Sequence, residues 1–211
     1  MNELGFLLAV TASTFAIVDP VGAVPFFVAL TDGFGEADRA FVLRRAVLLS
    51  AGLLAGFALF GRFLFFLFGF TLGAFEIAGG ILLFLVAYEM LHGKVGGTKL
   101  TDADREEAIA RRDELSVFPL AIPLLAGPGA ISTVMIYEGT AGADPLGIAS
   151  TFIAIGVTAA ATFLCLHFGV RIIRALGRTG VMATTRVMGL LLAAVGVQFV
   201  INGVLAVAPH L

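Results

Sequence analysis

The stretch TFAIVDPVGAVPFF, residues 14–27, decides the fold of this chain. It is an apolar run interrupted at its centre by a carboxylate, Asp19, which is followed by the helix-breaking Pro20 and by Gly22. Inside a bilayer, unpaired backbone groups and a charge are costly, so such a break is tolerated only where it is buried in protein or lines a cavity. The stretch therefore predicts a membrane-spanning helix that is broken at a candidate site.

The composition places the chain in a membrane. Hydrophobic residues make up 59% of it and the mean hydropathy is +1.04, while charged residues make up 13%, against about 25% in soluble domains. The net charge of −2 gives no indication of a nucleic-acid partner. The single cysteine, Cys165, excludes an intrachain disulfide and a cysteine-cluster metal site. The start of the chain lacks the basic region of a cleavable signal peptide, so we expect the first apolar segment to be retained.

Six segments are long and apolar enough to span a bilayer, which takes about 20 residues. They run from about Leu4 to Leu30, Ala46 to Phe68, Ala74 to Leu91, Val117 to Tyr137, Leu146 to Ile173 and Thr185 to Val207. The fourth contains three prolines and the pair Gly127 and Gly129, so it is predicted to be broken like the first. The polar stretch 31–45 is predicted to connect the first two. The chain divides into a first three-helix unit (1–92), a charged linker (93–116) and a second three-helix unit (117–211).

The basic residues predict the orientation in the membrane. Of the 13 lysines and arginines, all but Arg62 fall in the three connections that lie on one side of the six predicted segments. The positive-inside rule makes that side cytoplasmic. The linker 93–116 is then cytoplasmic and both termini lie outside.

Matching features in the two halves indicate an inverted repeat. Three pairs of features are 108 residues apart and a fourth pair is 110 apart. Because each half has an odd number of segments, the second half must be inserted upside down relative to the first. Such repeats are common in secondary transporters, where the site lies at the midplane between broken helices. The paired features are Asp19-Pro20 with Gly127-Pro128, Phe60-Gly61 with Phe168-Gly169, Gly69 with Gly177, and Glu76-x-x-Gly79 with Arg186-x-x-Gly189.

Three motifs, spread over essentially the whole chain, resemble those of the MarC family of bacterial inner-membrane proteins. They are Asp19-Pro20-x-Gly22-x-x-Pro25, the proline- and glycine-rich run from Pro119 to Ile131, and the run from Arg186 to Ala194 with Gln198-Phe199. The resemblance implies a six-helix fold in the superfamily of LysE-type exporters, located in the bacterial inner membrane. For some members it also implies transport of small neutral amino acids.

The residues at the two breaks suggest how a small zwitterion would be recognised. Pro20 suits the first position of a half-helix with Asp19 as its N-cap. The equivalent half-helix at Gly127 and Pro128 has no acidic cap, so its free N–H groups and partial positive charge suit a carboxylate. Asp19 would accept an ammonium group, a proton or a coupling cation, either H⁺ or Na⁺. The candidate substrate-binding residues are Asp19, Pro20, Gly22, Gly127, Pro128, Gly129, Ser132 and Thr133.

Asp19 and the candidates for gating or ion coupling also have simpler interpretations. Asp19 can act as a helix cap and nothing more. Glu76 and Arg186 are candidate gates or coupling residues, or two side chains that reach the opposite membrane surfaces. His167 is a candidate proton relay, or a hydrogen-bonding partner for a neighbouring helix. Gln198 and Asn202 are expected to join helices rather than to bind substrate.

The function predicted from the sequence is secondary transport of small neutral amino acids or similar solutes, driven by an ion gradient. A membrane scaffold or a passive pore is the alternative. An enzyme is disfavoured, because the sequence has no metalloprotease or phosphate-loop motif and only one aspartate well inside a span. No cofactor or metal is expected, and the partners are lipid and a small solute. The glycine-rich helices are compatible with a homo-oligomer.

Overall fold

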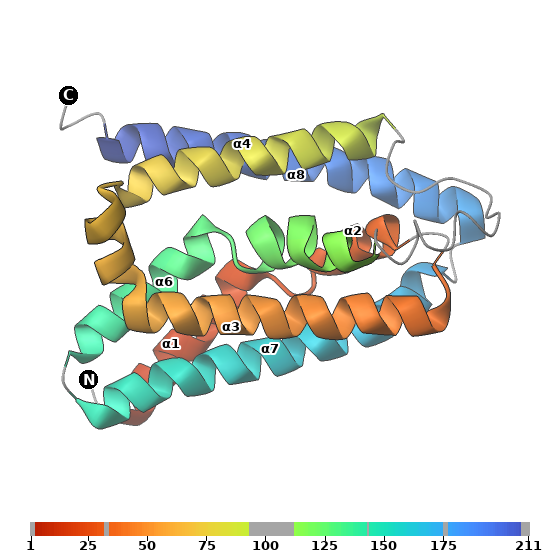
Figure 1. The fold of residues 1–211 in the computed structure, drawn as a ribbon. Helices are drawn as coiled ribbons and strands as arrows, with labels where there is room; N and C mark the ends of the chain where they lie inside the picture. The colour runs from red at the N-terminus through yellow and green to blue at the C-terminus, as the bar shows by residue number, and fades with distance from the viewer. Residues whose placement is uncertain (1–2, 32–33, 93–111, 143, 175–176, 208–211) are drawn as a thin grey trace.

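The computed structural model describes residues 3–31, 34–92, 112–142, 144–174 and 177–207. All of the regular structure in these ranges is helical (Figure 1). The elements are α1 (Glu3–Val18), α2 (Ala23–Leu30), α3 (Glu36–Phe68), α4 (Leu72–Leu91), the irregular segment η1 (Ser116–Leu125), α6 (Pro128–Ala141), α7 (Pro145–Arg174) and α8 (Gly177–Val207). The expectation of an all-helical chain is confirmed.

Large apolar side chains cover the outside of the helices, as expected for contact with lipid. On α3, the exposed fraction of Phe66 reaches 85%, and Phe60, Phe63 and Phe68 are also more than half exposed. Exposed apolar patches of this kind are rare in soluble monomers. The outward face of α3 therefore fits a bilayer and not water.

Three of the described helices are long and apolar enough to cross a membrane, and up to five spans result if each bent pair of helices counts as one. The bent pairs are α1 with α2, at 42°, and the helix 112–125 with α6, at 59°. In α4, the described apolar stretch Leu72–Tyr88 is shorter than a typical span. Both predicted broken helices are thus present, while six spans and an inverted repeat stay predictions.

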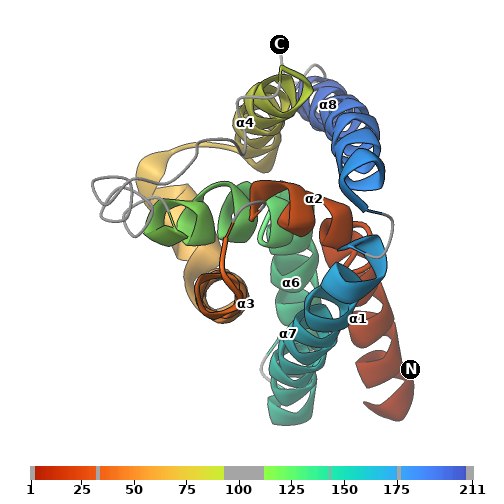
Figure 2. The same ribbon diagram turned by 90° about the vertical axis from the view of Figure 1, so that its right-hand side faces the viewer.

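The helices form two layers (Figure 2). The pair α4 and α8 lies along one side, and α1, α2, α3, η1, α6 and α7 form the other layer. Glycines join α4 to α8 closely: a Cβ on Gly73 would meet the carbonyl oxygen of Gly203 at 2.8 Å, and one on Gly80 would meet that of Gly196. Small residues at such positions allow helix backbones to approach in membranes. The backbones of α4 and α8 therefore contact each other directly at these glycines.

Helix α3 begins at Glu36, about ten residues before the segment predicted from hydropathy. Its first turns are held by polar contacts with neighbouring elements, which a hydropathy pattern does not include. The buried Arg39 donates from Nη2 to the carbonyl oxygens of Thr31 (2.8 Å) and Phe34 (3.1 Å). The ion pairs Asp38–Arg112 and Arg45–Asp113, each at 2.8 Å, join α3 to the helical turn that precedes η1. The predicted connection 31–45 is thus mostly helix.

The rest of the predicted linker cannot be compared, since residues 93–111 lie outside the described part of the chain. In the described part, α1 begins and α8 ends at the same end of the bundle (Figure 1). The ends of α2, α4 and α7 lie at the opposite end, together with the described arginines near them. This arrangement agrees with the predicted distribution of basic residues, and the orientation in the membrane stays a prediction.

Candidate solute-binding site

The first break is a tight turn organised by Asp19. Its φ of 46° is in the left-handed region, which ends α1, and its amide still donates to the carbonyl oxygen of Phe15 at 3.0 Å. Left-handed backbone is uncommon except for glycine, asparagine and aspartate. The carbonyl oxygen of Asp19 accepts from the amide of Ala23 at 3.0 Å, and its Oδ1 accepts from the amide of Gly22, also at 3.0 Å. The carboxylate is thus held over the start of α2.

The regular half-helix α2 starts at Ala23, three residues after the predicted start at Pro20. Pro20 is buried in the turn, and Asp19 caps that turn through Gly22. Gly22 leaves room for the carboxylate in this position, because a Cβ here would overlap Oδ2 of Asp19 and lie 2.7 Å from its Cγ. Asp19 itself is exposed, so its carboxylate is accessible.

The second break is caused by prolines. Phe118 and Ile122, which precede Pro119 and Pro123, have extended backbone angles near φ −127° and ψ 127° inside η1. A residue before proline is pushed out of the helical region by the proline ring. After this kink Gly127, in an extended conformation, precedes α6 without any side-chain cap, and Pro128 occupies the first turn.

The start of α6 presents free backbone donors. The first amide with an intrahelical acceptor is that of Ile131, which donates to the carbonyl oxygen of Gly127 at 3.0 Å. The amides of Gly129 and Ala130 precede it and therefore have no carbonyl of their own helix to bond. They lie at the positive end of a helix of 14 residues. This arrangement can bind a carboxylate.

Three other helices converge on the start of α6. A Cβ on Gly129 would lie 3.2 Å from Cγ2 of Ile17 in α1 and 3.6 Å from Cζ of Phe199 in α8. A Cβ on Gly79 of α4 would lie 2.9 Å from Cδ of Pro128. Because Ile17 is two residues before Asp19, this contact places the last turn of α1 against the second break. That the predicted residues of both breaks form one site stays a prediction.

Two predicted hydroxyl partners are already engaged within α6. Ser132 Oγ and Thr133 Oγ1 both donate to the carbonyl oxygen of Gly129, at 2.9 and 2.8 Å. Their oxygens are left as acceptors. They therefore position the first turn of α6, and any direct contact with a solute would be through these acceptors.

The candidate gates lie away from the breaks. The half-buried Glu76 is near the start of α4, between the glycines that pack against Gly196 and Gly203 of α8. The exposed Arg186 precedes Gly189, which packs at the far end of α4 against Met90 and Leu91. The two residues are thus at opposite ends of the α4–α8 pair. This agrees with the interpretation of two side chains reaching opposite surfaces, and the gating role stays a prediction.

His167 is exposed on α7, where its ring stacks on Phe163 at 5.9 Å and meets the edge of Phe168 at 5.1 Å. A role as a proton relay stays a prediction. Within the described ranges, no group of three histidine, cysteine or acidic side chains could hold a metal ion.

Two residues that the sequence did not single out as site residues lie at or near the breaks. Phe199 is part of the motif Gln198-Phe199, and its ring lies within 4 Å of the positions that a Cβ on Gly127 or Gly129 would take. Thr14 is fully buried one turn before Val18, and its hydroxyl has no hydrogen-bond partner among the described residues. An unpaired buried hydroxyl costs about 1–3 kcal/mol. In the sequence, Thr14 is a polar residue at the start of the apolar run 14–27.

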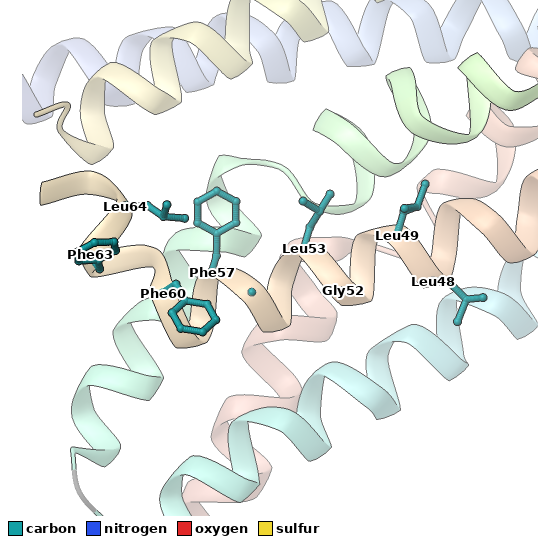
Figure 3. Close-up of a pocket in the computed structure, with 9 residues that line it drawn as sticks. Leu48, Leu49, Gly52, Leu53, Phe57, Phe60, Phe63 and Leu64 are labelled. Atoms are coloured by element: carbon teal, nitrogen blue, oxygen red, sulfur yellow. The ribbon is translucent and has the colours of Figure 1, made fainter. Parts of the chain in front are cut away.

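A hollow of about 540 Å³ lies elsewhere, along the outward face of α3 (Figure 3). It is lined by apolar residues and glycine only: Leu48, Leu49, Gly52, Leu53, Gly56, Phe57, Phe60, Phe63 and Leu64. A charged or zwitterionic solute would find no polar partner there. The hollow fits lipid chains better than a transported solute.

Comparison with known proteins identifies the family. The model of the MarC family of integral membrane proteins matches residues 4–208. The chain belongs to the MarC family. It is 43% identical over 190 residues to a UPF0056 membrane protein of Pyrococcus abyssi, covering 90% of each chain. It is 38% identical over 207 residues to the UPF0056 membrane protein YvbG of Bacillus subtilis, covering 98% of this chain and 97% of the relative.

A third relative, the UPF0056 membrane protein YhcE of Escherichia coli, is 36% identical over 198 residues, covering 93% of this chain and 91% of the relative. No solved structure matches. The predicted resemblance to the MarC family is confirmed, and this MarC protein is an integral, multi-pass membrane protein. The relatives include an archaeal protein, so the family extends beyond bacteria.

Proposed function

We propose that this MarC protein is a secondary transporter of small neutral amino acids or similar small solutes, located in the bacterial inner membrane and driven by an ion gradient. The observation that carries the proposal is the meeting of two broken helices with opposite charge. One break presents the Asp19 carboxylate, and the other presents the free amides of Gly129 and Ala130 at an uncapped helix start. A zwitterion would bind its ammonium group at the first break and its carboxylate at the second.

The packing pattern supports two equivalent, inverted halves. If α1 and α2 correspond to η1 and α6, then α3 corresponds to α7 and α4 to α8. Several observed contacts then have a counterpart: α1 with α7 and η1 with α3, α2 with α7 and α6 with α3, and α2 with α8 and α6 with α4. The contacts of α6 with α7, α7 with α8 and α4 with η1 are not matched to the same extent. The matched contacts are those expected of a two-fold axis in the membrane plane.

We place the coupling ion, H⁺ or Na⁺, at the end of α1. Asp19 supplies a carboxylate there, and the unpaired Thr14 hydroxyl one turn earlier supplies a neutral oxygen. The C-terminal carbonyls of a half-helix carry partial negative charge, which favours a cation. A scaffold would need neither feature.

The test is uptake of labelled glycine and alanine into vesicles that contain the purified protein, with and without H⁺ and Na⁺ gradients. We expect uptake above that of empty vesicles, and we expect it to require one of the two gradients. Uptake that is independent of both gradients would indicate a passive pore. Uptake equal to that of empty vesicles under every gradient would overturn the amino-acid assignment.

Phe199→Leu is expected to change which solutes are accepted. The smaller side chain would uncover the space beside Gly127 and Gly129, because the ring lies 3.6–3.8 Å from the positions that a Cβ on these glycines would take. We predict that uptake of valine relative to glycine rises several-fold. Phe168→Leu, at an exposed position on α7, is the control and should leave the ratio unchanged. An unchanged ratio in Phe199→Leu would place the solute away from this ring.

A further inference from the structure

Two carboxamide side chains lie on the outward face of α8. Gln198 and Asn202 are both exposed, and Gln198 Nε2 donates to Asn202 Oδ1 at 2.7 Å. Within the described part of the chain this is their one hydrogen bond, which leaves Gln198 Oε1 and Asn202 Nδ2 without partners. The helix-joining role expected from the sequence is therefore not fulfilled by another described helix of the same chain.

Lipid cannot hydrogen-bond to these two side-chain amides, because they lie deep within a membrane-spanning stretch of α8. The part of α8 that qualifies as a membrane span is Arg186–Val207, and Gln198 is close to its middle. At 1.5 Å per residue, Gln198 is roughly 13–18 Å from either end of that span. Hydrocarbon offers no hydrogen-bond partner, and a carboxamide side chain is too short to reach the interface from there.

The two amides belong to a regular seam. Counting along α8, the exposed residues Leu191, Val195, Gln198, Asn202 and Leu205 are separated by four, three, four and three positions. This spacing is that of the contact line of a left-handed helix pair, in which a polar residue within an apolar line fixes the register. We call these five residues the α8 seam.

The side of α8 opposite the seam carries a second line of regularly spaced residues, and this line packs against α4. Gly189, Gly196 and Gly203 are spaced by seven residues, and all three pack closely against α4. The α8 seam has the same period and its members remain exposed, and α8 itself lies at the edge of the molecule (Figure 2). One face of α8 is thus paired with α4, and the other has no partner among the described residues.

We propose that the α8 seam is the interface between two copies of this chain, with the two α8 helices packed side by side and parallel. Copies inserted in the same orientation can be related by a two-fold axis along the membrane normal, which makes the helices parallel and brings like residues together. Carboxamides both donate and accept, so each pair can bond to the same pair in the other copy. A partner of other chemistry would not need this self-complementary pattern.

The first test is disulfide cross-linking in membranes. The native cysteine is removed by Cys165→Ala, and a single cysteine is introduced at Val195 in the seam or at Val204 outside it. The two valines are matched, since both are on α8 and their exposed fractions are 45% and 49%. On oxidation we expect a product of twice the chain mass that is several-fold more abundant for Val195→Cys than for Val204→Cys. Equal yields, no product, or a product with a different protein would each overturn the proposal.

The second test removes the amides. Gln198→Leu with Asn202→Leu should raise the dissociation constant of the dimer about tenfold, since it removes two interhelical polar contacts and each contributes about 0.6 kcal/mol on average in membranes, a factor of roughly three. Energy transfer between labelled copies, followed on dilution with lipid, measures this constant. Amide substitutions that reduce uptake but leave the dissociation constant unchanged would assign the pair to the solute path and overturn the dimer interface. The cross-linking test retains both amides and is therefore independent of how the double variant folds.

Discussion

Gly80→Ala is expected to destabilise the protein by roughly 1–3 kcal/mol, because it inserts a methyl group into a contact between two backbones. The new Cβ would overlap the carbonyl oxygen of Gly196 and lie 2.9 Å from the amide nitrogen of Val200. Neither atom belongs to a flexible side chain, so α4 and α8 would have to move apart. Unfolding in a denaturant titration, followed by helix content, measures the change in free energy.

The matched control for this prediction is Gly156→Ala. Gly156 is also within a long helix, α7, and a Cβ there would meet no atom within 4 Å. Replacing glycine by alanine in a helix is favourable by about 0.5–1 kcal/mol when nothing is displaced. Opposite signs at the two glycines are therefore expected. Equal effects would contradict the close packing of α4 on α8.

Gly22→Ala is expected to abolish gradient-driven uptake without replacing a charged residue. Its Cβ would overlap Oδ2 of Asp19 and lie 3.2 Å from Oδ1. The carboxylate would have to rotate away, which breaks its hydrogen bond with the amide of residue 22. Uptake of labelled alanine under the productive gradient is the measurement, and Gly156→Ala serves again as the control.

A double variant tests whether Gly22→Ala abolishes uptake by displacing the Asp19 carboxylate. If Gly22→Ala acts by displacing the carboxylate, Asp19→Asn should cause no further loss in that background, since the two changes remove the same interaction. Retention of wild-type uptake by Gly22→Ala would show that the carboxylate position is unimportant.

Much of the fold follows from short-range rules that can be read in the sequence. Pro20 lies in the interior of an apolar run, where proline removes a helical hydrogen bond and clashes with the preceding turn, and Pro119 and Pro123 force the residues before them into extended backbone. Both broken helices could therefore be predicted. The run from Gly127 to Ala130, with a proline in the first turn and no capping side chain, likewise predicts the free amides at the start of α6.

The remaining features depend on contacts between distant residues. The early start of α3 depends on Asp38 and Arg39 meeting partners on other elements. The approach of Phe199 to Gly129 depends on how α8 is seated on α4, which glycine spacing alone does not specify. Helix geometry places the hydroxyls of Ser132 and Thr133 near the preceding turn, but only the structure shows that both donate to the carbonyl oxygen of Gly129.

If Asp19 couples an ion gradient to solute uptake, Asp19→Asn should remove that coupling. Asparagine tolerates the left-handed backbone at this position, and its Oδ1 can still accept from the amide of Gly22, so the turn is preserved while the charge is removed. The measurement is gradient-driven uptake of glycine and alanine by equal amounts of folded wild type and variant in vesicles. We expect uptake by the wild type and none above empty vesicles by the variant, with the same thermal unfolding for both. Equal gradient-driven uptake by the two proteins would contradict it.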